Sequence, residues 1–431
     1  MAQPTYPSLE YLLVAAVAGA GSYLATPLAR AIAVRWKAIA RPRERDVHAV
    51  AIPRMGGVAL FVGFGLAIFV ASRLPTLQDA FSHTTGYEMP WILAAGGLLC
   101  LIGALDDRYE LDSITKLAGQ VLATSIMVTL GGVQLTYLSP PWGTHNTIVV
   151  GQDIAIPVTI LLTVLTINAV NFVDGLDGLA AGVTAIAALS FFAFSYNLGR
   201  NDFIQIAAPP MLLTAALAGT CIGFLPHNFF PARIFMGDSG SMLAGLMLSA
   251  AATTATTNID PQGFNGSPLK TLPLYLPLLI PIAVLAIPFV DLLLAVFRRV
   301  SRGQSPFAPD KRHLHHRLLE LGHSHRRAVL LLYFWSALVG FGGAILAIFS
   351  GAWVLVAVVF AGVVIGVLLL VVPRLKARRR TARRRREQVA RERSKHSAAS
   401  IIATHSPPAP AASGNGASRR SEGDLSRHSA L

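Results

Sequence analysis

The sequence predicts an all-α, polytopic membrane protein, and two observations carry this prediction. Of the 431 residues, 53% are hydrophobic and only 13% are charged, whereas soluble domains carry about 25% charged residues. The apolar residues also form runs of about 17–22 residues, which is the length that crosses a bilayer as a helix. A soluble multidomain protein is therefore excluded.

Windows of about 19 residues predict eleven membrane-spanning helices. They lie near residues 9–29, 56–72, 90–105, 115–131, 154–170, 179–197, 205–225, 239–256, 273–296, 328–349 and 352–372. The preceding residues, MAQPTYPSLE, contain no Lys or Arg, so they lack the basic start of a cleavable signal peptide. We therefore expect the first helix to remain in the mature protein.

The basic residues predict how these helices are oriented in a bacterial cell membrane. With the N-terminus outside, only Arg73, Arg200 and Lys270 of the 36 basic residues fall outside the cytoplasm. Cytoplasmic loops are enriched in Lys and Arg. An odd number of spans then places the C-terminus in the cytoplasm.

The last part of the chain differs in composition from the rest. Residues 1–373 form the predicted membrane domain, and residues 374–431 form a disordered, Arg-rich cytoplasmic tail with most of the net charge of +14. Because most of the net charge lies in this tail, nucleic acid is not an expected partner. We expect the tail to be attracted to anionic membrane lipids, and a simple topology anchor is the alternative.

Acidic residues gather on the predicted cytoplasmic side. Those in cytoplasmic loops or at cytoplasmic helix ends are Asp46, Asp106, Asp107, Asp112, Asp174, Asp177, Asp238 and Asp310, and Asp291 lies within two turns of that side. Carboxylates at a membrane boundary are costly to desolvate. Each could cap a helix or pair with an Arg, but the set as a whole indicates a bound cation or a charged substrate.

Two segments hold the densest polar patterns. Residues 103–120 (GALDDRYELDSITKLAGQ) place adjacent Asp106 and Asp107 before Lys116, and adjacent carboxylates need a metal ion, a proton or a cationic group to coexist out of water. Residues 168–182 (NAVNFVDGLDGLAAG) repeat Asn and Asp at the spacing of one helix face. Their glycines allow the backbone to approach a ligand closely.

Two further segments contain candidate ligands. Residues 226–241 (PHNFFPARIFMGDSGS) end with Asp238 at the start of a predicted span, where it is either a helix cap or a magnesium ligand. Residues 310–317 (DKRHLHHR) crowd histidines and basic residues into one loop. Zinc is disfavoured there, because Cys100 and Cys221 both lie in apolar runs and no cysteine completes a compact site.

These four segments, with VHAVAIPRMGG at 47–57, resemble the polyprenyl-phosphate N-acetylhexosamine-1-phosphate transferases over approximately residues 45–325. The H-x-H-H arrangement is similar to the WecA type, which transfers GlcNAc-1-phosphate, and the His-His-His-Phe-Glu block of the MraY type is absent. The resemblance implies a fold of ten or eleven helices with a cytoplasmic active-site cleft. It also implies Mg²⁺-dependent transfer of GlcNAc-1-phosphate from UDP-GlcNAc to undecaprenyl or decaprenyl phosphate, releasing UMP and initiating cell-wall or surface polysaccharide synthesis.

The resemblance assigns roles to individual residues. It implies that Asp238 and Asn171 bind Mg²⁺, for which Mn²⁺ can substitute. The implied catalytic residues are Asp106, Asp107, Lys116, His313, His315 and His316, and the implied substrate-binding residues are Asn168, Asp174, Asp177, Asn228, Phe235, Arg312 and His48. Phe235 as a base-stacking residue competes with Phe235 as ordinary core. We expect the aspartate pair to position the acceptor rather than deprotonate it, because a phosphate monoester has a second pKa of about 6.

Other functions stay open at this point. A cation-coupled transporter would also show intramembrane acids and glycine-interrupted helices. The acids lie at one face rather than at the midplane, which favours an enzyme. Within the family a phospho-MurNAc-pentapeptide transferase is the alternative, and the sequence leaves the oligomeric state open, with a homodimer as one possibility.

Overall fold

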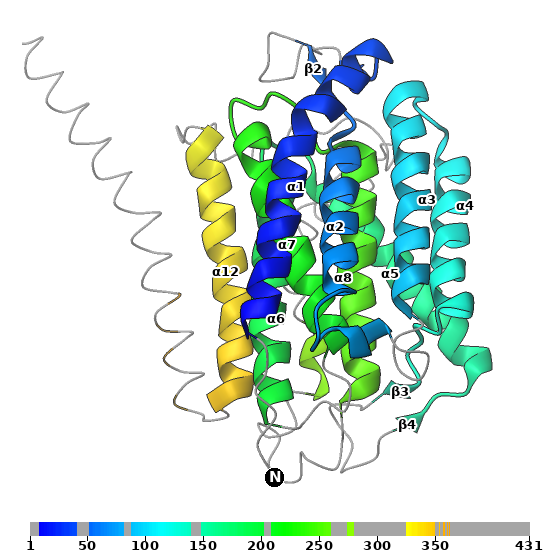
Figure 1. Ribbon diagram of the computed structural model, residues 1–431, viewed down its shortest axis with the longest axis vertical. Coiled ribbons are helices and arrows are strands. Elements are labelled where there is room, and N and C mark those ends of the chain that lie inside the picture. Colours follow the sequence, from blue (N-terminus) through cyan, green and yellow to red (C-terminus); the bar gives the residue numbers. More distant parts are fainter. Residues whose placement is uncertain are drawn as a thin grey trace, which may run out of the picture. The chain divides into compact units, whose positions relative to one another are not determined.

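A computed structural model gives the structure of the protein. It describes residues 8–40, 51–81, 88–138, 148–201, 208–259, 274–279 and 325–349, with the single positions 353, 357, 360 and 362. The chain divides into two units, Met1–Gly366 and Val367–Leu431, and all described residues belong to the first. Within that unit the described residues form a bundle of long helices (Figure 1).

The described residues include nine long helices and one π-helical turn. Their bounds are α1 Ser8–Arg35, α2 Gly56–Ala71, α3 Glu88–Tyr109, α4 Ser113–Ser125 with a π-helical turn at Ile126–Leu130, α5 Gln152–Val173, α6 Leu179–Arg200, α7 Ala208–Asn228, α8 Gly237–Asn258 and α12 His325–Phe349. A 3₁₀ turn covers Gln78–Phe81. The predicted all-α fold class is confirmed.

Two short antiparallel ribbons join helices. Strand β1 (Ile39–Ala40) pairs with β2 (Ile52–Pro53), with Ile39 opposite Pro53. Strand β3 (Tyr137–Leu138) pairs with β4 (Ile148–Val149), with Tyr137 opposite Val149. Each strand is two residues long, so the ribbons fix connections and add no sheet layer.

The helices have the length and composition of membrane spans. Among the described residues, seven helices are long and apolar enough to cross a membrane, namely α1, α3, α4 with its π-helical turn, α5, α6, α7 and α12, and α2 is a shorter apolar helix. This confirms a polytopic membrane protein. The predicted spans 273–296 and 352–372 lie mostly outside the described residues, so the number of eleven stays a prediction.

Helix α8 is the central element of the bundle. Every residue from Ser239 to Thr256 is buried, and α8 packs against α2, α3, α5, α6 and α7. Its sequence is rich in Gly, Ala, Ser and Thr. Small side chains allow neighbouring membrane helices to approach closely, which explains how one helix can contact five others.

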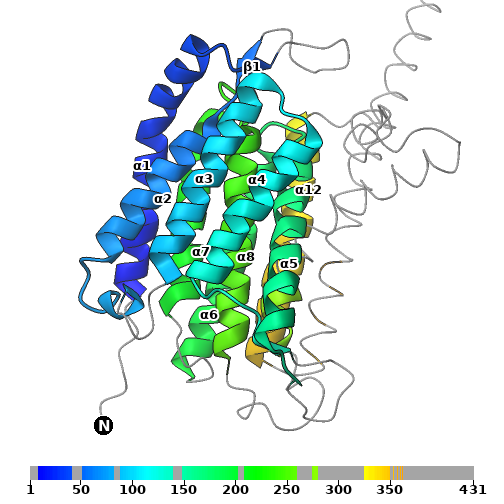
Figure 2. The ribbon, with the colours of Figure 1, turned by 90° about the vertical axis from the view of Figure 1, so that its right-hand side faces the viewer.

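Helices α1, α2 and α7 pack at especially short range. A Cβ atom added at Gly223 would overlap the carbonyl group of Gly19, and one added at Gly63 would lie 2.5 Å from the carbonyl oxygen of Ala18. The backbones are therefore in direct contact. Figures 1 and 2 both show α1 and α2 side by side.

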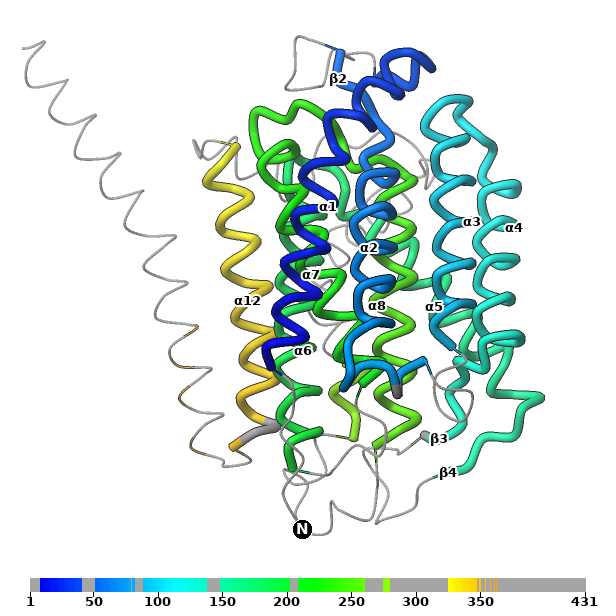
Figure 3. Tube along the Cα trace, in the orientation of Figure 1, coloured from blue at the N-terminus to red at the C-terminus, as the bar shows by residue number. Residues whose placement is uncertain are grey.

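The antiparallel course of the chain brings many helix ends together. Helices α3, α5 and α7 end where α4, α6, α8 and α12 begin, as the tube in Figure 3 shows. We call this the site end of the bundle, because the polar segments singled out in the sequence lie there.

Candidate active site

Three carboxylates and one lysine meet at the site end. Asp106 and Asp107 lie in the last turn of α3, Asp238 in the first turn of α8, and Lys116 near the start of α4. The Lys116 Nζ atom is 3.1 Å from Asp106 Oδ2 and also contacts Asp238 Oδ2. Helices distant in sequence thus converge on a single ammonium group.

Asp238 is the most accessible carboxylate of this group. Its side chain is 28% exposed, compared with 10% for Asp106. A charged side chain that is both ion-paired and open to solvent can exchange its partner for a ligand. Asp238 therefore has the exposure that a metal or substrate ligand needs.

Asp107 serves a different purpose from its neighbour, because it caps α8. It is 6% exposed, and its two oxygens accept hydrogen bonds from Asp238 N at 2.9 Å, Ser239 N at 3.3 Å and Ser239 Oγ at 2.8 Å. Gly237 makes this possible, since its φ is +70° and an added Cβ would lie 2.5 Å from Asp107 Oδ2. Asp107 thereby fixes where α8 begins.

The turn between α3 and α4 places Lys116. Asp106 Oδ1 accepts a hydrogen bond from Leu111 N at 2.8 Å. Asp112 caps α4 by accepting from Ile114 N and Thr115 N, both at 3.0 Å. Hydrogen bonds from Thr115 lower the pKa of Asp112, so this cap stays ionised at neutral pH.

Asn171 of α5 lies against Asp238, as the metal-ligand prediction requires. Its Nδ2 atom donates to Asp238 Oδ1 at 2.6 Å and to Ser241 Oγ at 2.8 Å. The structure thus brings together the two residues expected to bind Mg²⁺. Among the described residues, no three His, Cys, Asp or Glu side chains gather closely enough to hold a metal ion by themselves.

Asp174 lies in the loop between α5 and α6, at the edge of the same group. Its carboxylate accepts a hydrogen bond from the backbone of Gly237. Burial raises the pKa of Asp174 to about 8, the charges of Asp238 and Asp107 add to the rise, and Arg54 opposes it. Without a bound cation, Asp174 is therefore largely protonated at neutral pH.

Asn168 lies one turn before Asn171 and is held from α4. Its Nδ2 atom donates to Gln120 Oε1 at 2.7 Å and to Val164 O at 2.8 Å. Gln120 is 1% exposed, and its own amide nitrogen lies 3.3 Å from Met242 Sδ. This contact joins the helix of Lys116 to the helix of Asn171.

Asp177 and Asn228 shape the loop that leads into α8. Asp177 accepts a hydrogen bond from Ala232 N at 2.9 Å, and Asn228 donates to Ile234 O at 3.0 Å. Both side chains are buried. Phe235 is half-buried, and its backbone is held by Gly56 N at 3.0 Å and Pro53 O at 2.9 Å.

Five of the predicted site residues, His48, Arg312, His313, His315 and His316, lie outside the described residues, as do Asp46, Asp291 and Asp310. Their roles stay predictions. The described part brings together Asp106, Asp107, Lys116, Asn171, Asp174 and Asp238. It also adds residues that the sequence did not single out.

The added residues are Gln120, Ser239 and Ser241. The two serines could have been found from the sequence, because they directly follow Asp238 where a predicted helix begins. Almost no pattern in the sequence marks Gln120 as a site residue, since a single amide residue in the first half of an apolar run resembles any polar helix residue near a membrane boundary. Only the packing of α4 against α5 shows its contact with Asn168.

Comparison with known proteins places this geometry in context. The family described as Glycosyl transferase family 4 matches residues 89–256. This segment runs from the start of α3 almost to the end of α8. It includes all six residues that the structure brings together at the site end.

Several relatives match over most of the chain. A decaprenyl-phosphate N-acetylglucosaminephosphotransferase of Mycobacterium tuberculosis is 48% identical over 362 residues, covering 83% of this chain and 88% of the relative. A protein of the same name from Mycolicibacterium smegmatis is 47% identical, covering 78% and 82%. A probable undecaprenyl-phosphate N-acetylglucosaminyl 1-phosphate transferase of Bacillus subtilis is 31% identical, covering 73% and 78%.

Proposed function

Since the chain belongs to the polyprenyl-phosphate N-acetylglucosamine-1-phosphate transferases, we propose that it transfers GlcNAc-1-phosphate from UDP-GlcNAc to a polyprenyl phosphate. The enzyme is therefore a glycosyl-1-phosphate transferase. In this reaction an oxygen of the lipid phosphate attacks the phosphorus that carries the sugar. The bond from that phosphorus to UMP breaks. The products are polyprenyl-diphosphate-GlcNAc and UMP.

The observation that carries the proposal is the position of Lys116 between Asp106 and Asp238, beside Asn171. Two anionic substrates must approach each other, so the site has to supply positive charge that is fixed in place. Lys116 is one such charge, and its contact with the partly exposed Asp238 can be exchanged for contacts with phosphate oxygens.

A divalent cation is the second positive charge that we propose. Mg²⁺ is usually bound through one or two carboxylates, with water and substrate phosphates completing its octahedron. Asp238 and Asn171 fit this pattern, because a partly exposed carboxylate lies beside a side-chain amide that can turn its oxygen toward the ion by rotation. These two residues would hold Mg²⁺ or Mn²⁺, and the ion would neutralise the diphosphate of the donor.

Asp106 and Asp107 position other groups in this proposal and do not deprotonate the acceptor. The oxygens of Asp107 hold the start of α8, and those of Asp106 hold Leu111 and Lys116. The acceptor phosphate is already largely an oxyanion at neutral pH, because its second pKa is about 6. A general base is therefore unnecessary.

We assign the nucleotide to the loop that contains Asp174 and to the neighbouring Phe235. Asp174 can accept hydrogen bonds from uracil or ribose, and the half-buried ring of Phe235 offers a stacking surface. Asp177 and Asn228 contribute by holding the loops before α6 and α8 in place, since their buried side chains form hydrogen bonds with the backbone.

The proposed reaction takes place at the cytoplasmic side of a bacterial cell membrane. The donor is a cytoplasmic sugar nucleotide and the acceptor is a membrane lipid, so the site must lie where both are present. This side agrees with the excess of Lys and Arg in the segments that flank the site end.

Turnover by the purified protein tests the proposal. With UDP-GlcNAc, decaprenyl phosphate and MgCl₂, we expect UMP release to match the formation of the lipid-linked sugar. Omitting the lipid or adding EDTA should abolish both. Solute uptake into proteoliposomes without UMP release would instead identify a transporter.

Donor preference tests the assignment within the family. We expect kcat/KM for UDP-GlcNAc to exceed that for UDP-MurNAc-pentapeptide, because a ratio of kcat/KM measures relative transition-state stabilisation. A preference for the pentapeptide nucleotide would overturn this assignment and leave the fold class intact.

A further inference from the structure

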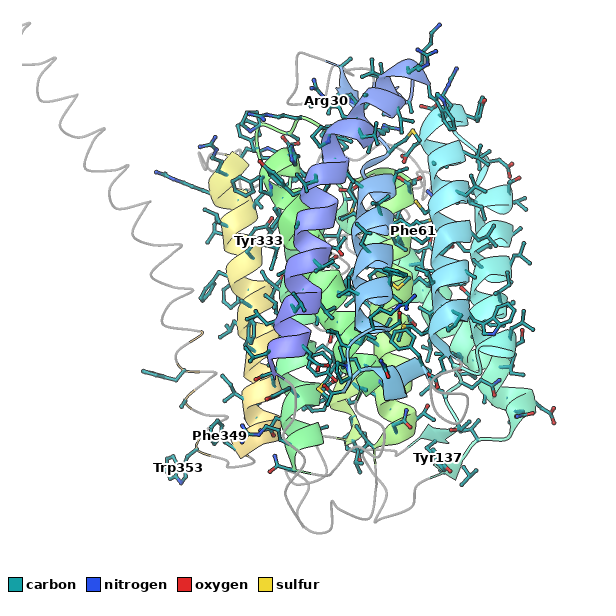
Figure 4. All side chains as sticks on the ribbon, in the orientation of Figure 1. Arg30, Phe61, Tyr137, Tyr333, Phe349 and Trp353 are labelled. Carbon is teal, nitrogen blue, oxygen red and sulfur yellow. The ribbon has the colours of Figure 1, made fainter. Side chains whose placement is uncertain are left out.

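Helix α12 carries none of the motifs described above, yet one of its side chains reaches the site end. Tyr333 donates a hydrogen bond from its hydroxyl group to the carbonyl oxygen of Gly178. Figure 4 shows Tyr333 on the side of α12 that faces the bundle. Gly178 closes the loop that begins at Asp174, so α12 contacts the segment assigned to the nucleotide.

The glycines around this contact leave space for the Tyr333 ring. A Cβ atom added at Gly182 would overlap the ring and hydroxyl of Tyr333. At Gly178, φ is +76° and an added Cβ would lie 2.9 Å from Phe229 Cδ2. Gly178 and Gly182, two of the three glycines of the DGLDGLAAG stretch, therefore leave room for the aromatic rings of Phe229 and Tyr333 at the start of α6.

The first turn of α12 makes a second contact with the site end. The His325 ring stacks on Phe230 with centroids 4.6 Å apart, and Arg326 Nε donates to Phe230 O at 3.1 Å. Two residues further on, Ala232 N binds Asp177. Helix α12 thus contacts both loops that Asp177 ties together.

These contacts place Tyr333 at one end of a short chain of fixed groups. Gly178 O accepts from Tyr333 and also from Gly182 N at 2.9 Å, which starts the first turn of α6. The neighbouring residue is Asp177, and Asp174 lies one loop turn before it. A shift of the Gly178 carbonyl therefore moves the backbone that carries both aspartates.

We propose that Tyr333 is a positioning residue for the nucleotide half of the donor, acting through the Gly178 carbonyl on the loop of residues 174–178. The inference rests on the proposed function, since the ligand of this loop is the uridine nucleotide. Tyr333 does not touch the reacting phosphates. Its loss should weaken donor binding and leave binding of the lipid acceptor unchanged.

The variant Tyr333→Phe tests this inference, because it keeps the ring against Gly182 and removes only the hydroxyl. We expect KM for UDP-GlcNAc to rise about 2- to 10-fold, which corresponds to one net hydrogen bond. KM for decaprenyl phosphate should stay unchanged, kcat should stay within about two-fold, and thermal stability in detergent should be close to wild type. Binding of UMP, measured by calorimetry without lipid, should weaken by the same factor as KM for the donor.

The matched control is Tyr11→Phe, which removes the hydroxyl of a buried tyrosine near the start of α1. This helix start lies at the end of the bundle opposite the site end (Figure 3). It should leave both KM values unchanged. If Tyr333→Phe raises both KM values equally, lowers kcat alone, or changes neither, Tyr333 does not position the nucleotide loop. If the wild-type protein neither binds UMP nor turns over UDP-GlcNAc, the proposed function itself fails, and the inference fails with it.

Discussion

At the scale of single residues, adjacent carboxylates in the site have different tasks. Successive residues on a helix point about 100° apart, so Asp106 faces Lys116 while Asp107 faces the start of α8. Asp238 then receives contacts from Lys116 and Asn171 and stays the most exposed of the three. Each carboxylate can therefore be tested separately.

Replacing Asp238 with Asn should abolish turnover while the protein still folds and inserts. A neutral amide is a much poorer partner than a carboxylate for Mg²⁺. The measurement is UMP release over a wide range of Mg²⁺ concentration. Asp153→Asn, at an exposed position in the first turn of α5, is the matched control and should retain full activity. Near-normal turnover of Asp238→Asn at ordinary Mg²⁺ concentration would remove it from the metal site.

Replacing Asp107 with Asn should lower kcat by a factor that does not depend on pH. The amide accepts fewer hydrogen bonds from the start of α8, and Asp238 is displaced as a result. Neither effect depends on the protonation state of the acceptor phosphate. We would measure kcat from pH 5.5 to 9 for Asp107→Asn, Asp106→Asn and wild type. The lipid phosphate titrates near 6, so a loss confined to low pH and absent at pH 9 would instead identify a general base.

Cation binding should strengthen as the pH rises from 6 to 8. The pKa of Asp174 is raised to about 8, so the cation-free folded protein holds this proton more tightly than the unfolded chain. That contribution favours folding at low pH and is lost as the pH rises through about 8. A bound cation favours the ionised carboxylate, so binding releases the proton.

Mg²⁺ titration calorimetry at pH 6, 7 and 8 measures this dependence. Asp174→Asn should flatten it. Asp112→Asn should leave it unchanged, because the pKa of Asp112 is lowered and this residue does not titrate in that range. An affinity for Mg²⁺ that is the same at all three pH values in the wild type would contradict the prediction.

At the scale of helices, hydropathy predicts where an element lies better than where it ends. The first predicted span stops at residue 29, but α1 continues to Arg35, because its last turns contain Arg30 and Arg35 and lie beyond the apolar stretch. Similarly, Asp112 starts α4 as a side-chain cap, a signal that an apolar window does not register. Helix ends are set by hydrogen bonds, and only the apolar middle of a helix is set by hydrophobicity.

The close contact between α1 and α7 predicts a sharp difference between two glycines. Gly223→Ala should lower stability by about 1–3 kcal/mol, because the added methyl group would overlap the Gly19 carbonyl and the helices must separate. Gly65→Ala should be neutral, since an added Cβ meets no atom within 4 Å there. Thermal unfolding in detergent compares the two variants. Equal unfolding temperatures would show that α1 and α7 are not in backbone contact.

At the scale of the whole molecule, the sequence predicted the helical membrane fold, and its resemblance to the transferases placed Asp238 and Asn171 in one site, where the two side chains are in contact. It did not predict the contacts of Gln120 or Tyr333. A tyrosine in an apolar helix such as α12 has the same pattern whether it faces lipid or Gly178. Its partner lies 155 positions away in sequence, so the contact follows from the packing of α12 on α6 and from no local pattern.

The orientation of the molecule can be tested by cysteine labelling in intact cells. Both natural cysteines, Cys100 and Cys221, are buried, so the wild type gives a low background. A membrane-impermeant maleimide should label Arg73→Cys in intact spheroplasts and Ser113→Cys only after permeabilisation, because these exposed residues lie at opposite ends of the bundle. The reverse labelling pattern would place the site end outside the cell.

The capping of α4 and α8 has a consequence for how the site handles phosphate. A helix N-terminus carries about half a positive charge and often seats a phosphate group. Here the free amide groups of α8 bind Asp107 and those of α4 bind Asp112, so the dipoles of these two helices are already neutralised by the chain's own acids. Among the described residues, phosphate bound beside these two helices then draws counter-charge from side chains such as Lys116 and from a dissociable ion. In the proposed reaction, this ties the rate of lipid-linked sugar formation to the free magnesium level around the enzyme.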